Sequence, residues 1–215
     1  MSPLALNTIT MLLHQLLQGK RLVLASNSPR RKQLLAGLDV PFEVWLNSGN
    51  EPECYPDTLA IADVAPYLAR QKAANMQQQM ADDVVLITSD TVVCCNGQVL
   101  GKPSSSEAAR QMLAQLAGTT HTVVTGVCIT TKEQQHVFST ATDVTFAPLS
   151  DEQIAYYVER YKPLDKAGAY GIQEWIGYVG IERIEGSYYN VMGLPVQRLH
   201  DELVRMLSAQ CPDNQ

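Results

Sequence analysis

Three consecutive basic residues stand at the expected start of a helix, in the segment 26–35, which reads SNSPRRKQLL. Ser28 is a favourable N-cap and Pro29 a favourable first helical residue, so residues 30–32 fall in the first turn. Positive charge there opposes the helix dipole by roughly 0.3–1 kcal/mol per side chain. A bound anion would offset this cost, because free N–H groups, guanidiniums and serine hydroxyls together bind phosphate. The segment therefore predicts a phosphate site, with a solvated basic patch as the alternative.

Asp90 is the acidic residue best placed for chemistry. It follows the continuous, largely apolar run 84–88, which is typical of a central strand buried on both faces. We expect Asp90 just past the carboxyl end of that strand, where ligands bind in open α/β sheets. A carboxylate buried there is costly unless it is paired with a cation or bound to a metal. The alternative is an aspartate that caps the turn into the next strand.

Two lysines and two segments of small residues complete the candidate chemistry. Lys102 is held between a glycine and a proline, whereas Lys72, on a long expected helix, taken alone is a solvated helix residue. The segments 164–173 and 186–195 are too rich in small residues for helix cores, so they predict loops where backbone approaches a ligand. Tight turns without a ligand are the alternative for either segment.

Hydrophobic periodicity and capping signals predict the elements that must position these residues. Strands are expected at 22–25, 42–46, 84–88, 121–131, 136–146 and 179–184, a hairpin at 92–100, helices at 29–36 and 57–80, and further helices from about 104, 150 and 195. The long helix is expected to restart near Asp63, because Pro66 fits only a first turn. The pattern indicates an α/β fold with a mixed, strongly twisted central sheet flanked by helices.

Composition limits the classes of partner. The chain has 215 residues, 46% of them apolar, which is enough for a full core without disulfides or a structural metal. Its net charge of −6 argues against nucleic-acid binding, which requires a basic face, and favours a small anionic ligand for the cluster at 30–32. No apolar run reaches membrane-spanning length, so no membrane partner is expected. The G-x-G-x-x-G, P-loop and H-E-x-x-H motifs are absent.

The cysteines and the first residues bear on the compartment. The chain has five cysteines and no C-x-x-C pair, so reduced thiols and a cytoplasmic location are expected. Residues 1–20 do not have the order of a secretory signal, because Lys20 and Arg21 follow the apolar part. These residues instead predict an N-terminal helical extension docked on the body.

Five motifs, in order, make the chain similar to the Maf family of nucleoside triphosphate pyrophosphatases. They are SNSPRR at 26–31, SDT at 89–91, GKP at 101–103, DKAGAYGIQ at 165–173 and GSYYNVMGLP at 186–195. The resemblance covers residues 21–207 and implies one domain there, with 1–20 as an extension and 208–215 as a frayed tail. It also implies two lobes with a cleft, as in inosine triphosphate pyrophosphatases, and a homodimer.

The resemblance implies hydrolysis of a nucleoside triphosphate to the monophosphate and pyrophosphate with a divalent metal, Mg²⁺ or Mn²⁺. Asp90 matches the family's catalytic acid, and Glu51 and Asp90 match the acids expected at the metal. The positions expected to hold the triphosphate are Ser26, Arg30, Lys72 and Lys102, together with Ser28 at the helix start.

Base choice is the finer implication of the resemblance. Arg31, Thr91 and Gln173 match the positions linked to it in the subgroup that resembles dTTP/UTP pyrophosphatases, which also takes modified pyrimidines such as 5-methyl-UTP and pseudo-UTP. There are three departures. Asn50 replaces one acid of a usual pair, Ser89 stands before Asp90 where glycine or alanine is usual, and Glu174 follows Gln173 where glycine is common. The alternatives are a Maf-like enzyme for 7-methyl-GTP or CTP, and a weakly catalytic nucleotide-binding regulator of cell division.

Overall fold

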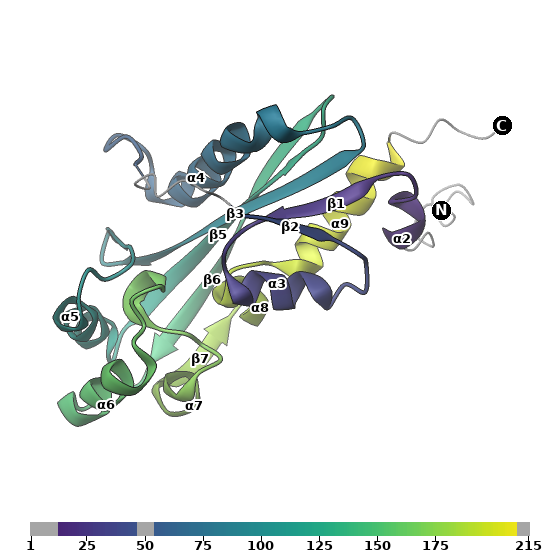
Figure 1. Cartoon of the computed structure of the whole chain (residues 1–215). Coiled ribbons are helices and arrows are strands. Elements are labelled where there is room, and N and C mark those ends of the chain that lie inside the picture. Colours follow the sequence, from purple (N-terminus) through teal and green to yellow (C-terminus); the bar gives the residue numbers. More distant parts are fainter. Residues whose placement is uncertain (1–12, 47–53, 210–215) are drawn as a thin grey trace, which may run out of the picture.

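The computed structural model describes residues 13–46 and 54–209. One mixed, twisted sheet forms the centre, with strand order β2-β1-β3-β5-β6-β7 and with β4 pairing β3 (Figure 1). β1 runs parallel to β2 and β3, and the other pairs are antiparallel, so the predicted mixed sheet is confirmed. The strands are β1 (Arg21–Ala25), β2 (Glu43–Trp45), β3 (Val84–Cys95), β4 (Gln98–Leu100), β5 (Thr120–Thr130), β6 (Gln135–Phe146) and β7 (Ile181–Glu185).

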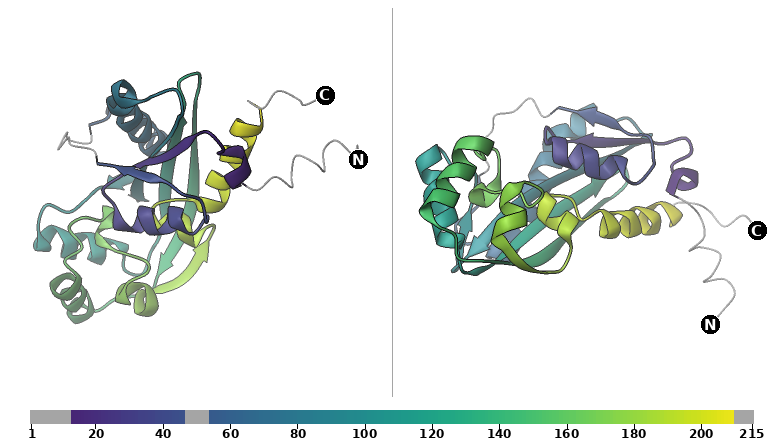
Figure 2. Two further views of the ribbon diagram at one scale, coloured as in Figure 1. Left: turned by 45° about the vertical axis from the view of Figure 1, so that its right-hand side comes forward. Right: turned by 90° about the horizontal axis from the view of Figure 1, so that it is seen from below.

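Helices flank the sheet on both faces and gather at one end of its long strands. The helices are α2 (Leu13–Leu16), α3 (Pro29–Ala36), α4 (Ile61–Met76), α5 (Ser106–Leu116), α6 (Asp151–Tyr161), α7 (Trp175–Gly180), α8 (Tyr188–Met192) and α9 (Val196–Ser208), with 3-10 turns η1 (Gln77–Gln79) and η2 (Ala167–Ala169). Figures 1 and 2 show α5, α6 and α7 at the end of the long strands opposite to α2 and α9.

The apolar run at the start of β3 is buried on both faces, as the sequence predicts. Leu86 belongs to the same buried cluster as Ala69 of α4. Ile87 belongs to the main core, together with Leu35 of α3 and Leu203 of α9. Alternate residues of β3 therefore face α4 on one side and the α3–α9 side on the other.

α4 approaches the sheet very closely over Gly126 of β5. A Cβ on Gly126 would lie 2.2 Å from the backbone nitrogen of Pro66 and 2.3 Å from the carbonyl carbon of Ala65. α4 begins at Ile61, two residues before the expected restart at Asp63, whereas 57–60 is not helical as expected and Pro66 lies beyond the first turn. Only glycine permits this contact, and it brings the whole of α4 against β3 and β5.

The described ends of the chain lie next to each other. Leu13 and Leu16 of α2, with Leu17, are buried in the main core, and α2 packs beside α9 (Figure 1). The remainder of the expected N-terminal extension, 1–12, lies outside the described residues, as does the 210–215 part of the expected tail. None of the described helices has the length and apolar character to cross a membrane.

Candidate active site

One stretch of β3 is paired on one side with none of the described strands. β1 pairs with β3 as far as Ile87, and β4 pairs with it from Val93 onward. The opposite edge of β3 is occupied by β5 along its length. The residues between Ile87 and Val93 therefore face an opening in the sheet, framed by the end of β1 and the start of β4.

Asp90 lies in the middle of this opening. The expectation that a strand ends at Thr88 is wrong, because β3 continues as one strand to Cys95. Asp90 is thus an internal strand residue opposite Gly126, not a residue past a carboxyl end. The sheet supports the aspartate on one side, and its other side is open to a ligand.

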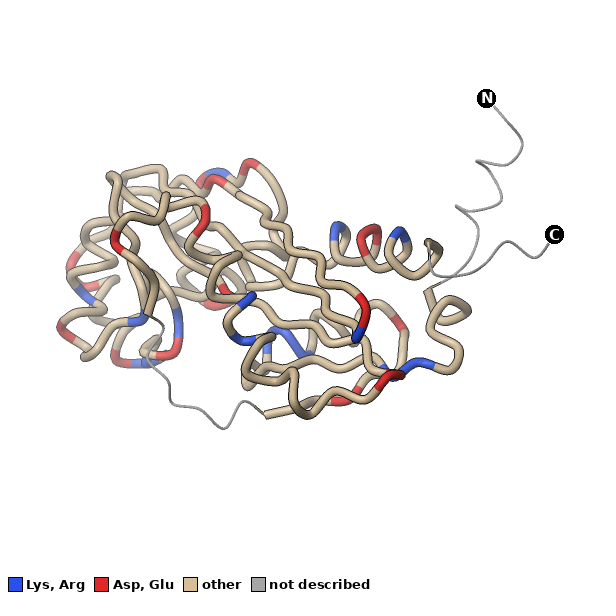
Figure 3. Tube along the Cα trace, turned by 90° about the horizontal axis from the view of Figure 1, so that it is seen from above, with Lys and Arg blue, Asp and Glu red and all other residues tan. Residues whose placement is uncertain are grey.

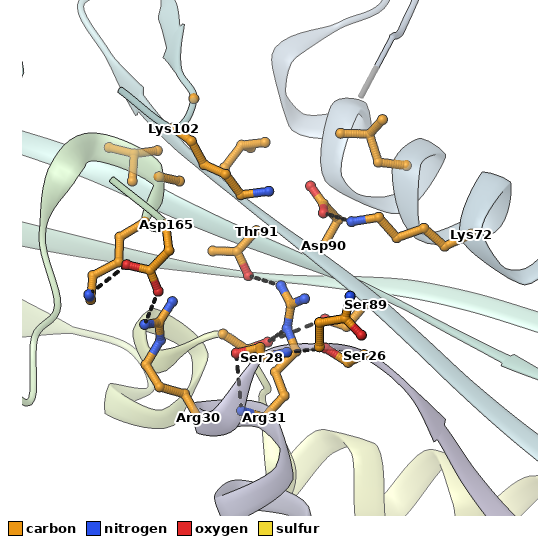
Figure 4. A pocket seen from close by; sticks show the side chains of 18 of the residues that line it. Ser26, Ser28, Arg30, Arg31, Lys72, Ser89, Asp90, Thr91, Lys102 and Asp165 are labelled. Carbon is orange, nitrogen blue, oxygen red and sulfur yellow. Dashed lines mark hydrogen bonds and ion pairs between the residues drawn. The ribbon is translucent and has the colours of Figure 1, made fainter. Parts of the chain in front are cut away.

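A pocket of about 1230 Å³ occupies the opening. This volume exceeds the roughly 300–1,000 Å³ of sites for drug-sized ligands. Every expected site residue within the described part of the chain lines it, namely Ser26, Ser28, Arg30, Arg31, Lys72, Asp90, Thr91, Lys102 and Gln173. Figure 4 labels all of these except Gln173 and shows their side chains converging from several elements. The expected metal residue Glu51 lies outside the described residues.

The pocket is cationic within an acidic protein. The described charged residues that line it are five cations, Arg30, Arg31, Lys72, Lys102 and Lys166, and two acids, Asp90 and Asp165. The chain as a whole carries −6, and Figure 3 shows acidic and basic residues interspersed along the trace. The local excess of positive charge favours an anionic ligand.

The start of α3 has the expected capping geometry. Ser28 is the N-cap, and its hydroxyl accepts a hydrogen bond from the Arg31 backbone nitrogen at 3.4 Å. Ser26 supports this turn, because its hydroxyl accepts from the Ser28 nitrogen at 3.2 Å. The local signals in the sequence thus predicted both the start of α3 and its place beside the pocket.

The two arginines of the first turn diverge. Arg30 donates to Oδ2 of Asp165 at 3.2 Å. Arg31 donates through Nε to the Gly193 carbonyl at 2.8 Å and through a terminal nitrogen to the Thr91 hydroxyl at 3.0 Å. Both side chains lie in the pocket wall, so the alternative of a solvated basic patch is wrong for this pair.

β3 presents Asp90 and Thr91 on opposite faces of the sheet. Asp90 is only 4% exposed, and its Oδ1 is paired with the Lys72 ammonium of α4. Thr91 faces the α3 side, where it contacts Arg31 and lies 2.9 Å from the Thr125 hydroxyl. The pocket reaches both residues at the open edge of β3, so one ligand can contact the two faces of the sheet (Figure 4).

Lys102 and Gln173 approach the pocket from the side of β4 and η2. The Lys102 side chain points into the same space as Asp90 (Figure 4). Gln173 carries a buried side-chain oxygen that has no hydrogen-bond partner in the described structure. A buried acceptor without a partner costs about 1–3 kcal/mol.

The family model described as Maf-like protein matches residues 21–206. The chain belongs to the Maf family. Proteins named dTTP/UTP pyrophosphatase resemble it over nearly their whole length. The one from Phocaeicola vulgatus is 55% identical over 88% of this chain and 98% of that protein, and the one from Parabacteroides distasonis is 54% identical over 87% and 96%. Among solved structures, the Ham1 protein of Staphylococcus aureus is 17% identical over 89% of this chain and all of that one, with a TM-score of 0.45.

Beside the pocket of this Maf protein lies a buried ionic group that the sequence did not predict. The Lys166 ammonium is 2.8 Å from Asp165 Oδ1 and 3.2 Å from Glu174 Oε1. Burial of Asp165 works against ionisation, but Lys166 and Arg30 outweigh it and leave the Asp165 pKa lowered. The small residues of 164–173 predicted a loop whose backbone approaches a ligand, but nothing in their pattern shows that Lys166 would be buried.

An aromatic cluster lies beneath the pocket in the Maf domain. Tyr170 lines the pocket, and its hydroxyl lies 2.8 Å from Nε2 of His121. Phe146 packs edge-on against both rings. Burial lowers the pKa of His121 to about 4, with Asp143 acting weakly in the other direction, so the imidazole is neutral at pH 7.

Proposed function

We propose that this Maf protein hydrolyses dTTP, UTP and modified pyrimidine triphosphates to the monophosphate and pyrophosphate, as a form of nucleotide-pool sanitation. The observation that carries the proposal is the placement of Asp90 in a pocket with Arg30, Lys72 and Lys102. A triphosphate carries about four negative charges, so its hydrolysis is catalysed chiefly by positioning and charge neutralisation. The names of the relatives support the same reaction and the same pair of substrates.

In this proposal the cations hold the triphosphate and Asp90 handles the proton. Arg30, Lys72 and Lys102 contact the phosphates, together with the hydroxyls of Ser26 and Ser28 and the positive end of the α3 dipole. A water molecule attacks the α-phosphorus, and Asp90 accepts its proton. The bond from the α-phosphorus to the bridging oxygen then breaks, and pyrophosphate leaves. One water is consumed for each monophosphate and pyrophosphate formed.

We propose a divalent metal, Mg²⁺ or Mn²⁺, as the cofactor. The described residues contain no group of three or more metal-ligating side chains, and a single carboxylate faces the α4 side of the pocket. This donor set fits a hard cation held by one or two carboxylates and the substrate's own phosphates. Asp90, with Glu51, would hold it. When bound, the metal would neutralise the developing charge on the phosphates.

Base selection is assigned to Arg31, Thr91 and Gln173. All three residues line the pocket, and uracil and thymine both carry an N3–H donor between two carbonyl acceptors that polar side chains can pair. Cytosine presents the reverse pattern at the same edge, with an acceptor at N3 and an amino donor at C4. A site built for a hydrogen bond discriminates strongly against a base that lacks it.

A pyrophosphate-release screen tests the proposal. Purified protein with Mg²⁺ or Mn²⁺ is incubated with dTTP, UTP, 5-methyl-UTP, pseudo-UTP, CTP, ATP, GTP and 7-methyl-GTP. We expect the uridine and thymidine nucleotides to give the highest kcat/KM. Equal turnover of ATP or GTP would overturn the substrate assignment. Nucleotide binding without pyrophosphate release would instead identify a binding regulator.

We further propose that residues 21–207 act as one catalytic domain in a cytoplasmic homodimer. The four described cysteines are free thiols, which supports a reducing compartment. The dimer follows from the family resemblance alone. Light scattering on the purified protein measures its mass in solution, and a monomer of 23.7 kDa at working concentrations would contradict the dimer.

A further inference from the structure

Asp165 is an acidic side chain in the wall of a pocket that is proposed to hold a triphosphate. It lines the pocket together with Arg30 and Lys102, and its side chain is 60% exposed (Figure 4). A carboxylate at this position repels phosphate, because both carry negative charge. The catalytic steps proposed above do not use this acid, so its presence beside the phosphate-binding cations requires another explanation.

Both oxygens of the Asp165 carboxylate are paired with cations. Oδ1 lies 2.8 Å from the Lys166 ammonium, and Oδ2 accepts a hydrogen bond from a terminal nitrogen of Arg30 at 3.2 Å. Partial burial opposes ionisation of Asp165, but the two cations outweigh it and lower the Asp165 pKa, so the carboxylate is ionised at pH 7. Its negative charge is therefore compensated within the protein before a ligand enters the pocket.

Lys166 fixes the position of the Asp165 carboxylate. The Lys166 side chain is only 8% exposed, and its ammonium also lies 3.2 Å from Oε1 of Glu174. Oε2 of Glu174 accepts a hydrogen bond from the Tyr157 hydroxyl of α6. A buried ammonium retains its paired carboxylates, because losing one would leave its charge uncompensated. Asp165 is thus anchored through Lys166 and Glu174 to α6.

Arg30 has a long side chain whose backbone alone is fixed by α3, in which it is the second residue. The bond to Asp165 adds a fixed point at the far end of that side chain. A guanidinium is planar and carries five N–H donors in a rigid arrangement, so holding one of them restricts where the others point. Figure 4 shows the Arg30 side chain reaching from the start of α3 across the pocket wall to Asp165.

We propose that Asp165 is a positioning residue that holds the Arg30 guanidinium in the orientation that binds the phosphates. The proposal rests on the proposed function, in which Arg30 contacts the triphosphate. A guanidinium that is already held loses less conformational freedom when the substrate binds, so less of the binding free energy is spent on ordering it. This gain exceeds the repulsion between Asp165 and the phosphates, because Lys166 compensates the charge of the carboxylate.

Asp165→Asn tests the proposal, because it preserves the size of the side chain and removes its charge. Inorganic tripolyphosphate is the probe, since it carries the phosphates without a base, and calorimetry measures its dissociation constant. We expect Asp165→Asn to raise this constant and the KM for UTP about fivefold, equivalent to roughly 1 kcal/mol, the upper end for an exposed ion pair. A lower constant would show that Asp165 competes with phosphate for Arg30, and would overturn the proposal.

Glu159→Gln is the matched control. Glu159 is an exposed acid on α6 that also pairs with an arginine, Arg110, at 2.9 Å, but it does not line the pocket. The control should retain the dissociation constant of the unaltered protein. An equal rise in both variants would show a general effect of charge, and would contradict a specific role for Asp165.

Two further measurements separate positioning of Arg30 from a structural role in the loop. Once Arg30→Ala has removed the guanidinium, adding Asp165→Asn should leave the dissociation constant unchanged. The UTP-to-CTP ratio of kcat/KM should also stay that of the unaltered protein, because only a displacement of the loop would move Gln173 as well. Fully additive effects in the double variant, or a changed ratio in Asp165→Asn, would overturn the proposal.

If Asp165→Asn does not fold, Asp165→Glu replaces it. This variant keeps a negative charge for Lys166 but displaces the acceptor from Arg30 by one methylene group, so it should weaken tripolyphosphate binding in the same direction. An unchanged dissociation constant would then overturn the proposal. Failure of the proposed function gives a different result, namely no pyrophosphate release from any nucleotide, while tripolyphosphate binding still tests Asp165. Absence of tripolyphosphate binding by the unaltered protein would contradict both.

Discussion

Asp90 lies directly opposite Gly126 in the β3–β5 pairing, and α4 covers both residues. The absence of a side chain on Gly126 lets the backbone of α4 approach the sheet at Pro66. The same helix carries Lys72, which pairs with Asp90. One glycine on β5 therefore determines how closely the cation-bearing helix can approach the proposed catalytic acid.

Gly126→Ala should destabilise the protein strongly. The new Cβ would meet backbone atoms of Pro66 and Ala65, which cannot move without shifting α4. Overpacking of this kind costs about 1–3 kcal/mol, and we expect the upper end of that range in urea unfolding. Gly101→Ala is the control, because its Cβ would meet nothing within 4 Å. Equal stability of the two variants would show that α4 adapts freely.

Asp90→Asn should reduce turnover of dTTP by 100-fold or more, since loss of a general base costs roughly 10²–10⁴-fold. Binding should survive, because the cations that contact the phosphates remain in place. Pyrophosphate release measures turnover, and calorimetry with a nucleotide whose α and β phosphorus atoms are joined by a methylene group measures binding. Near-normal turnover with intact binding would remove Asp90 from both the proton-transfer role and the metal role.

Chelation should abolish activity without unfolding the protein. The described pocket lacks a complete protein cage for an ion, so the metal is expected to enter with the substrate and to leave readily in excess EDTA. Adding Mg²⁺ or Mn²⁺ in excess should restore pyrophosphate release, and circular dichroism should remain constant throughout. Full activity after exhaustive chelation would contradict the metal-dependent reaction.

Stability should fall between about pH 6.5 and pH 4 through His121. Burial lowers its pKa to about 4 in the folded protein, whereas the unfolded chain has the ordinary value near 6.5. Above pH 6.5 both states are neutral and the contribution is complete. As pH falls, the unfolded state takes up a proton first, so up to about 3 kcal/mol of stability is lost by pH 4. Urea unfolding at a series of pH values measures this loss. The free energy of unfolding of His121→Gln should fall less steeply as the pH decreases, and an equally steep fall in both proteins would contradict the role of His121.

Local signals in the sequence determined the start of the phosphate site. The bounds of α3 and its Ser28 cap follow from a few adjacent residues, because capping involves only the first turn of a helix. The burial of the run that begins β3 was equally predictable, since alternate side chains must face both sides of the sheet. The ordered motifs also identified the site residues correctly as a group, because all of those within the described part of the chain line one pocket.

Only the tertiary structure decided how those residues face one another. Whether Asp90 ends a strand or lies inside one depends on where β1 and β4 stop along β3, and that is a relation between distant segments. The two arginines also have distant partners. The partner of Arg30 lies 135 positions away along the chain, and the two partners of Arg31 lie 60 and 162 positions away. The burial of Lys166 depends on Glu174 across a folded loop. Such contacts are set by packing of the whole chain, which no local pattern of residues specifies.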